Sequence, residues 1–217
     1  MAMTVKLDKR NGYFARSPLF WFVLILFTIV LFAALSPQER ILGENARIVY
    51  LHGAWVWASL ATFLAAGLVG LAGLVSGRKS VHSWSRALGR TGLFFWITYL
   101  PVSIWAMQTS WNGLYLAEPR FRIAVIFSIS GLLLQVGLTL LENPAWASAG
   151  NLAFVIALIF TLANTQNVMH PTSPMFDSNA PRIQWSFSIL FILALLAAWQ
   201  VTRFWFSQEI QETANSR

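Results

Sequence analysis

Six apolar runs constrain the fold of this chain more than any other feature of its sequence. Each run has about 17 to 28 residues, the length at which an α-helix crosses the roughly 30 Å hydrocarbon layer of a bilayer. A backbone exposed to lipid must satisfy its own hydrogen bonds, so such runs favour helices. The sequence therefore predicts an all-α integral membrane protein, a six-transmembrane-helix bundle that forms a single membrane domain over residues 1–217. The expected helices cover residues 18–35, 48–75, 91–107, 121–141, 149–166 and 183–206.

Composition supports the same class. The chain is 57% apolar and only 11% charged, with a mean hydropathy of +0.60, whereas soluble domains carry about 25% charged residues. Its net charge of +7 comes from basic residues between the apolar runs, which is typical of contact with anionic lipid. We expect the lipid bilayer as a partner and no nucleic acid, because no basic stripe or soluble domain is present. The absence of Cys excludes disulfides, thiolate metal sites and covalent haem attachment.

The distribution of Lys and Arg predicts the orientation. Ten basic residues fall on one side of the membrane: they lie before the first run, between the second and third runs, and at the C-terminal end of the chain. Five fall on the other side, namely Arg40, Arg47, Arg120, Arg122 and Arg182. The positive-inside rule then places both termini in the cytoplasm. The segments 36–47, 108–120 and 167–182 are expected to face outward.

Two histidines are expected on this outer side. His52 lies one turn inside the second run, and His170 follows the fifth run. Two neutral imidazoles on one face at membrane depth suit a six-coordinate haem iron. Alternatively, each histidine only bonds a neighbouring helix. A third alternative is a transition-metal site completed by Met169, Asp177 or Glu118.

The remaining histidine, His82, lies in the basic segment between the second and third runs. We expect it to be solvated at the inner interface. A protease or hydrolase is not predicted, because the apolar runs contain neither a Ser/His/Asp set nor a pair of carboxylates. The glycines of the second run, Gly67, Gly70 and Gly73, are expected to let a neighbouring helix approach closely.

An aromatic segment follows the third run. Trp111 and Tyr115 are four residues apart, so on a helical turn they would share one face and form a shelf at the outer interface. Such a shelf stacks on a porphyrin or belongs to an ordinary interfacial belt. Outer arginines either pair bidentately with carboxylates such as haem propionates or bind lipid phosphates while paired with Glu44 and Glu118. These arginines are Arg47, Arg120, Arg122 and Arg182.

The arrangement resembles the haem-handling proteins of c-type cytochrome maturation, the CcmC/CcsA family. The likeness covers roughly residues 38–205 and includes Arg-Ile-x-Tyr-x-His before the first histidine and an aromatic outer loop. The family's loop has the pattern Trp-Gly-x-Trp-Trp-x-Trp-Asp-x-Arg. Without a gap, Trp111, Glu118 and Arg120 fall on its first Trp, its Asp and its Arg. Leu114, Tyr115 and Ala117 stand where the family has tryptophan.

The resemblance implies a function without catalysis. His52 and His170 would ligate one non-covalent b-type haem at the outer face, for transfer or export. Trp111, Tyr115 and Glu118 would belong to the presenting loop, and Arg47 and Arg120 would pair with the propionates. The location would be the cytoplasmic (inner) membrane of a bacterium, with other membrane proteins of a maturation or transport complex as partners. The alternative is a non-catalytic integral membrane subunit of a larger complex that kept the bundle and lost haem transfer.

Overall fold

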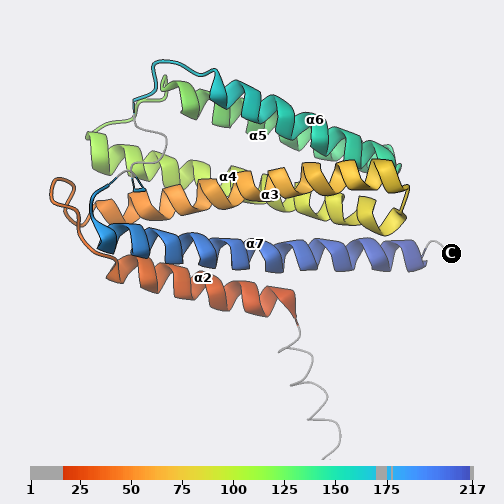
Figure 1. The fold of residues 1–217 in the computed structure, drawn as a ribbon, viewed down its shortest axis with the longest axis horizontal. Helices are drawn as coiled ribbons and strands as arrows, with labels where there is room; N and C mark the ends of the chain where they lie inside the picture. The colour runs from red at the N-terminus through yellow and green to blue at the C-terminus, as the bar shows by residue number, and fades with distance from the viewer. Residues whose placement is uncertain (1–16, 170–174, 177, 216–217) are drawn as a thin grey trace, which may run out of the picture.

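The computed structural model describes residues 17–169, 175–176 and 178–215. In these residues the regular structure is α-helical throughout, with six helices and no strand (Figure 1). The helices, in chain order, are α2 (Pro18–Leu35), α3 (Ala46–Ser76), α4 (Lys79–Trp111), α5 (Pro119–Leu140), α6 (Pro144–Ala163) and α7 (Pro181–Asn215). The expectation of an all-helical chain is therefore confirmed.

Five of the six described helices are long and apolar enough to cross a membrane. They are α2, α3, α5, α6 and the part of α7 that covers Pro181–Gln211. Their apolar side chains remain largely exposed in the isolated chain; only Ile29 and Ala33 of α2, for example, are buried. A helix that is apolar all round and exposed needs lipid around it, so the five helices indicate a multi-pass membrane protein.

The predicted start of the third helix is wrong. We expected it to begin at residue 91, but α4 begins at Lys79, two residues after Gly77 ends α3 with a φ of +65°. The segment 79–90 contains charged residues, which made it look like a solvated connection. In the structure it is helical because α3, α6 and α7 pack around α4. Pro101 lies inside α4 without ending it.

The last two helices also differ from their predicted ranges. Helix α6 begins at Pro144 and ends at Ala163, several residues earlier than expected, because the Asn143 side chain caps it by accepting from the Ala145 N–H at 3.0 Å. Helix α7 continues to Asn215. Helix α2 has the bounds that were predicted.

The helices run alternately up and down, so their connections collect at two ends (Figure 1). The segments 36–45, 112–118 and 164–180 join helices at one end, which we call the long-loop end. The shorter connections 77–78 and 141–143 lie at the other, which we call the short-turn end. The three predicted outer segments thus share one end of the bundle.

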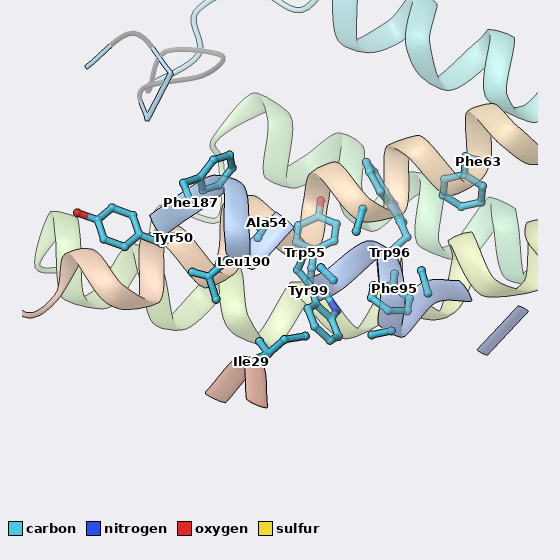
Figure 2. Packing of buried hydrophobic residues seen from close by; sticks show 14 of the residues in the cluster. Ile29, Tyr50, Ala54, Trp55, Phe63, Phe95, Trp96, Tyr99, Phe187 and Leu190 are labelled. Atoms are coloured by element: carbon cyan, nitrogen blue, oxygen red, sulfur yellow. The ribbon is translucent and has the colours of Figure 1, made fainter. Parts of the chain in front are cut away.

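The core lies where α3, α4 and α7 meet, with Ile29 of α2 reaching it from the side (Figure 2). Trp55 of α3 stacks on Phe95 of α4 with ring centroids 4.5 Å apart. The Trp96 indole N–H donates to the Ala124 carbonyl on α5 at 3.1 Å. Large aromatic rings therefore fill the centre of the bundle, and the indole N–H groups of Trp55 and Trp96 donate to adjacent helices.

Small residues bring α3 close to its neighbours, as predicted. A Cβ added to Gly70 would lie 2.8 Å from the Ser148 carbonyl oxygen on α6, and one at Gly73 would lie 2.8 Å from His82 Nδ1. Real Cβ atoms do not approach other atoms so closely. The glycines are therefore required for the packing of α3 against α6 and the start of α4.

Candidate functional site

The long-loop end gathers most of the candidate residues. His52 lies in the second turn of α3, Trp111 ends α4, Glu118 caps α5 and Arg120 lies in its first turn. The loop before α3 is tied to the end of α4, because the Asn45 side-chain amide donates to the Thr109 carbonyl at 3.3 Å. The sequence correctly predicted that these residues share one end.

His52 is half-buried, and its Nδ1 atom is enclosed. Its ring lies 5.7 Å from that of Tyr99 on α4, at an angle of 60°. The next residue, Gly53, leaves room for Phe187 of α7, whose ring edge would lie 3.0 Å from an added Cβ, and for the Met175 methyl group at 3.6 Å. This turn of α3 is therefore packed closely against α7 at Gly53 and contacts α4 through the His52 ring.

Neither Tyr99, which lies beside His52, nor Met175, which lies beside Gly53, was predicted as a neighbour of this part of α3. Both are buried, at 5% and 7% exposure. Tyr99 lies one turn after Trp96 on α4. Because this helix has many polar residues, its sequence does not show that Tyr99 is buried. The Met175 thioether is a ligand type that haem iron accepts. Because Met175 is more than a hundred residues from Gly53 in the sequence, its approach to this turn of α3 could not be predicted.

Glu118 is a buried carboxylate at 4% exposure. Its Oε2 atom accepts the Phe121 N–H at 2.7 Å and so caps α5. Its Oε1 atom is buried without a hydrogen-bond partner among the described residues, and the carboxyl is close enough to Tyr99 to act on it electrostatically. Glu118 therefore has one structural bond and one oxygen to which a donor can bind.

Trp111 and Tyr115 do not share a helical face. Helix α4 ends at Trp111, and Asn112 turns the chain with a φ of 53°. The two rings nevertheless contact each other, with centroids 5.7 Å apart and planes at 78°. The pair forms a corner: a flat ligand stacked on one ring would meet the other ring edge-on.

The arginines differ in their contacts. Arg47 donates through Nε to the Ser36 carbonyl at 3.1 Å and lies 3.8 Å from the Glu44 carboxylate, so it helps to close the loop before α3. Arg120 is partly buried, whereas Arg122 and Arg182 are exposed. Of the two arginines expected to bind propionates, Arg47 thus also has a structural role.

The loop before α3 has a built-in pH dependence. The N–H groups of Leu42 and Ile41 donate to Glu39 Oε2 at 2.9 and 2.8 Å, which lowers the pKa of the Glu39 carboxyl. A carboxylate with a lowered pKa stabilises the fold above its ordinary pKa. This contribution is lost as the pH falls through the lowered value.

Several candidates lie outside the described residues. They are His170, the predicted second ligand, and Asp177, one of the alternative metal ligands. Among the residues that the structure does describe, no group of three or more His, Cys, Asp or Glu side chains is placed to hold a metal ion. This finding does not test haem binding, which needs only one or two protein ligands besides the porphyrin.

His82 is not a solvated loop residue, contrary to the sequence prediction. It lies on α4 at 6% exposure, and its Nδ1 atom is 2.7 Å from the Ser148 hydroxyl on α6. The prediction failed because segment 79–90 is a packed helix. His82 is at the short-turn end, far along α4 from the candidate site.

Two arginines in the same segment form a buried ion cluster that the sequence did not reveal. Arg90 donates to the Glu209 carboxylate on α7 at 2.7 Å, and Arg86 donates to its other oxygen at 3.2 Å. The spacing of four residues places both arginines on one helical face. That spacing was the only available signal, because Glu209 lies more than a hundred residues away.

The fold thus defines an all-helical protein whose five apolar helices are those of a multi-pass membrane protein. Comparison of the chain with protein-family models and with curated proteins finds no match.

Proposed function

We propose that this chain is a haem-handling membrane protein that holds one b-type haem at its long-loop end. The observation that supports this most is the environment of His52, an imidazole fixed at membrane depth beside Tyr99 and at the same end as the buried Glu118. Ionisable groups within apolar bundles are costly. At the short-turn end Arg86, Arg90 and Glu209 form ion pairs, whereas at the long-loop end Glu118 Oε1 is buried with no donor among the described residues, which supports a ligand there. The resemblance to the CcmC/CcsA family supports haem as the proposed ligand.

The donor set fits an iron porphyrin. The chain has no thiolate, and imidazole is a common axial ligand of haem iron. His52 would ligate the iron from α3, and His170 is proposed as the second ligand. Arg120 and Arg47 would pair with the propionates, and the corner of Trp111 and Tyr115 would contact the ring. The bound haem would be cargo for transfer to another protein of a maturation or transport complex.

We further propose that α4 is a sixth transmembrane span. It runs beside α3 along most of the bundle and connects to α3 and α5, which are both long and apolar enough to span. Its low hydropathy follows from its surroundings, because other helices rather than lipid cover it. With six spans, both termini lie on the same side of the membrane. The excess of Lys and Arg makes this side the cytoplasm, and the membrane would be a bacterial inner membrane.

Cysteine labelling tests this topology in a chain that has no native Cys. Ile41 is 89% exposed in the long-loop end, and Ser80 is exposed at the short-turn end. In intact cells an impermeant maleimide should label Ile41→Cys, and it should label Ser80→Cys only after the membrane is permeabilised. The reverse pattern would show that the long-loop end faces the cytoplasm.

A second prediction concerns the aromatic corner. Trp111→Ala should weaken hemin binding about three- to tenfold, since an aromatic contact contributes about 0.5–1.5 kcal/mol beyond the area it buries. Trp111→Phe should retain most of the affinity and serves as the matched control. Hemin titration followed by absorbance gives the affinity. An unchanged affinity in Trp111→Ala would remove this residue from the site.

A non-catalytic structural subunit is the second candidate. The close packing of Gly53 against Phe187 and Met175 supports it, because a histidine held among packed helices is also typical of a purely structural bundle. An absorption spectrum of the purified protein, isolated from haem-replete cells and supplied with hemin, separates the two functions. A low-spin haem spectrum supports haem handling, and its absence favours the structural subunit.

A further inference from the structure

A groove on the side of the bundle lies between α4, α5 and α7, near the short-turn end. It has a volume of about 380 Å³ and is lined mainly by apolar side chains, among them Leu93, Phe94 and Ile97 of α4 and Val136 of α5. Val136 and Leu140, which also lines the groove, are 51% and 78% exposed. Because both belong to a helix that is apolar enough to span a membrane, the groove opens toward the lipid.

One end of the groove is cationic. Arg90 lines it, and its guanidinium donates to Thr139 in the last turn of α5 at 3.3 Å and lies 5.5 Å from the Trp205 ring. Arg86 is adjacent through the shared Glu209 carboxylate. Two arginines against one glutamate leave one positive charge in excess at this position.

Two further donors near the cluster lack partners. Arg86 Nη2 and Trp205 Nε1 are buried and have no hydrogen-bond acceptor among the described residues. Buried donors normally have an acceptor, and leaving one unsatisfied is costly. The cluster therefore has spare positive charge and spare donors, both of which an anionic oxygen group would complement.

Along the bundle, the cationic and apolar parts of the groove follow each other in the same order as the head group and acyl chain of a lipid. Arg90 lies at the level of the end of α5, where its partner Thr139 is located. Ile97 is seven residues further along α4, about 10 Å at the rise of an α-helix, in the direction of the bilayer centre. A ligand with an anionic head at Arg90 and an apolar tail along Leu93 and Ile97 would match both ends of the groove.

We propose that this groove binds an anionic phospholipid, with its phosphate at Arg90 and one acyl chain along α4 and α5. Basic pockets between transmembrane helices on the cytoplasmic side are known to favour anionic head groups. The proposal depends on neither haem binding nor His52, which lies at the other end of the bundle. A lipid bound here would brace α5 against α4 and α7.

The test uses the full-length protein purified in detergent, delipidated and then incubated with an equimolar mixture of phosphatidylglycerol and phosphatidylcholine with identical acyl chains. Native mass spectrometry counts the lipid that stays bound. The wild type should retain phosphatidylglycerol about five-fold over phosphatidylcholine, the factor expected from one basic residue near the membrane surface. Equal retention of the two lipids would overturn the proposal.

Variants separate the groove from the general lipid surface. Arg90→Gln should abolish the preference for phosphatidylglycerol. Val136→Trp should reduce retention of both lipids by filling the groove while leaving the ion cluster intact, so it tests the proposal even where Arg90→Gln fails to fold. Arg203→Gln is the control, because Arg203 is exposed on α7, donates to the Gln200 side chain at 3.0 Å and does not line the groove. A preference for phosphatidylglycerol that survives Arg90→Gln, or an unchanged retention of both lipids in Val136→Trp, would contradict the proposal.

Discussion

Glu209→Ala should lower the free energy of unfolding by about 3–5 kcal/mol, the usual cost of removing one partner from a buried ion pair. Glu209 is the carboxylate to which Arg86 and Arg90 donate, and its side chain is only 8% exposed. Without it, two guanidinium groups whose side chains are only 13% and 17% exposed would remain close together and lose this counter-charge. Unfolding in a denaturing detergent titration measures the change.

Two further variants make this prediction specific. Gln208→Ala changes the neighbouring residue on α7 and should cost much less, because Gln208 is only partly buried and is not in the cluster. The triple variant Arg86→Met, Arg90→Met and Glu209→Leu should recover much of the loss, since apolar residues often replace a buried ion cluster without a net cost. Equal effects of Glu209→Ala and Gln208→Ala would show that the cluster does not stabilise the fold.

The helices that face lipid could be predicted well from the sequence. Helix α2 has the predicted bounds of Pro18–Leu35 because it is apolar throughout and is bounded by polar residues. The same property allowed the close approach at Gly70 to be foreseen, since a small residue in an apolar run has few other roles. For these elements the local composition is sufficient.

Helix α4 could not be predicted in the same way. Its first three turns contain His82, Arg86 and Arg90, whose partners are Ser148 on α6 and Glu209 on α7. Hydropathy treats these side chains as solvated, because it contains no information on partners that are distant in the sequence. Because their polar side chains pair inside the bundle, hydropathy did not predict the first three turns of α4 as part of the helix.

The candidate site was predicted in its placement but not in its contacts. The up-and-down alternation of the helices was enough to bring His52, Trp111 and Glu118 to one end. The ring contact with Tyr99 and the cap that Glu118 provides depend on where α4 ends and α5 begins. Those boundaries are set by Asn112 and Pro119, which the pattern of apolar runs does not locate.

The second large effect is expected at His52. His52→Gly should convert bound haem from low-spin to five-coordinate or water-ligated iron, with a shifted Soret band, because one axial ligand is lost. Replacing His170 as well should abolish haem binding, because both axial ligands are then lost. His82→Asn serves as the control: it changes the histidine at the short-turn end and retains a side chain that can bond to Ser148.

Imidazole rescue of His52→Gly tests most directly the central claim that His52 ligates haem. The variant leaves space for a free imidazole beside Tyr99, where the native ring lies. We expect added imidazole to restore the low-spin Soret band of the wild type in a saturable titration, while the spectrum of His82→Asn stays that of the wild type throughout. If the wild type binds no hemin, or if His52→Gly has the wild-type low-spin spectrum before imidazole is added, His52 is not a ligand of the haem iron.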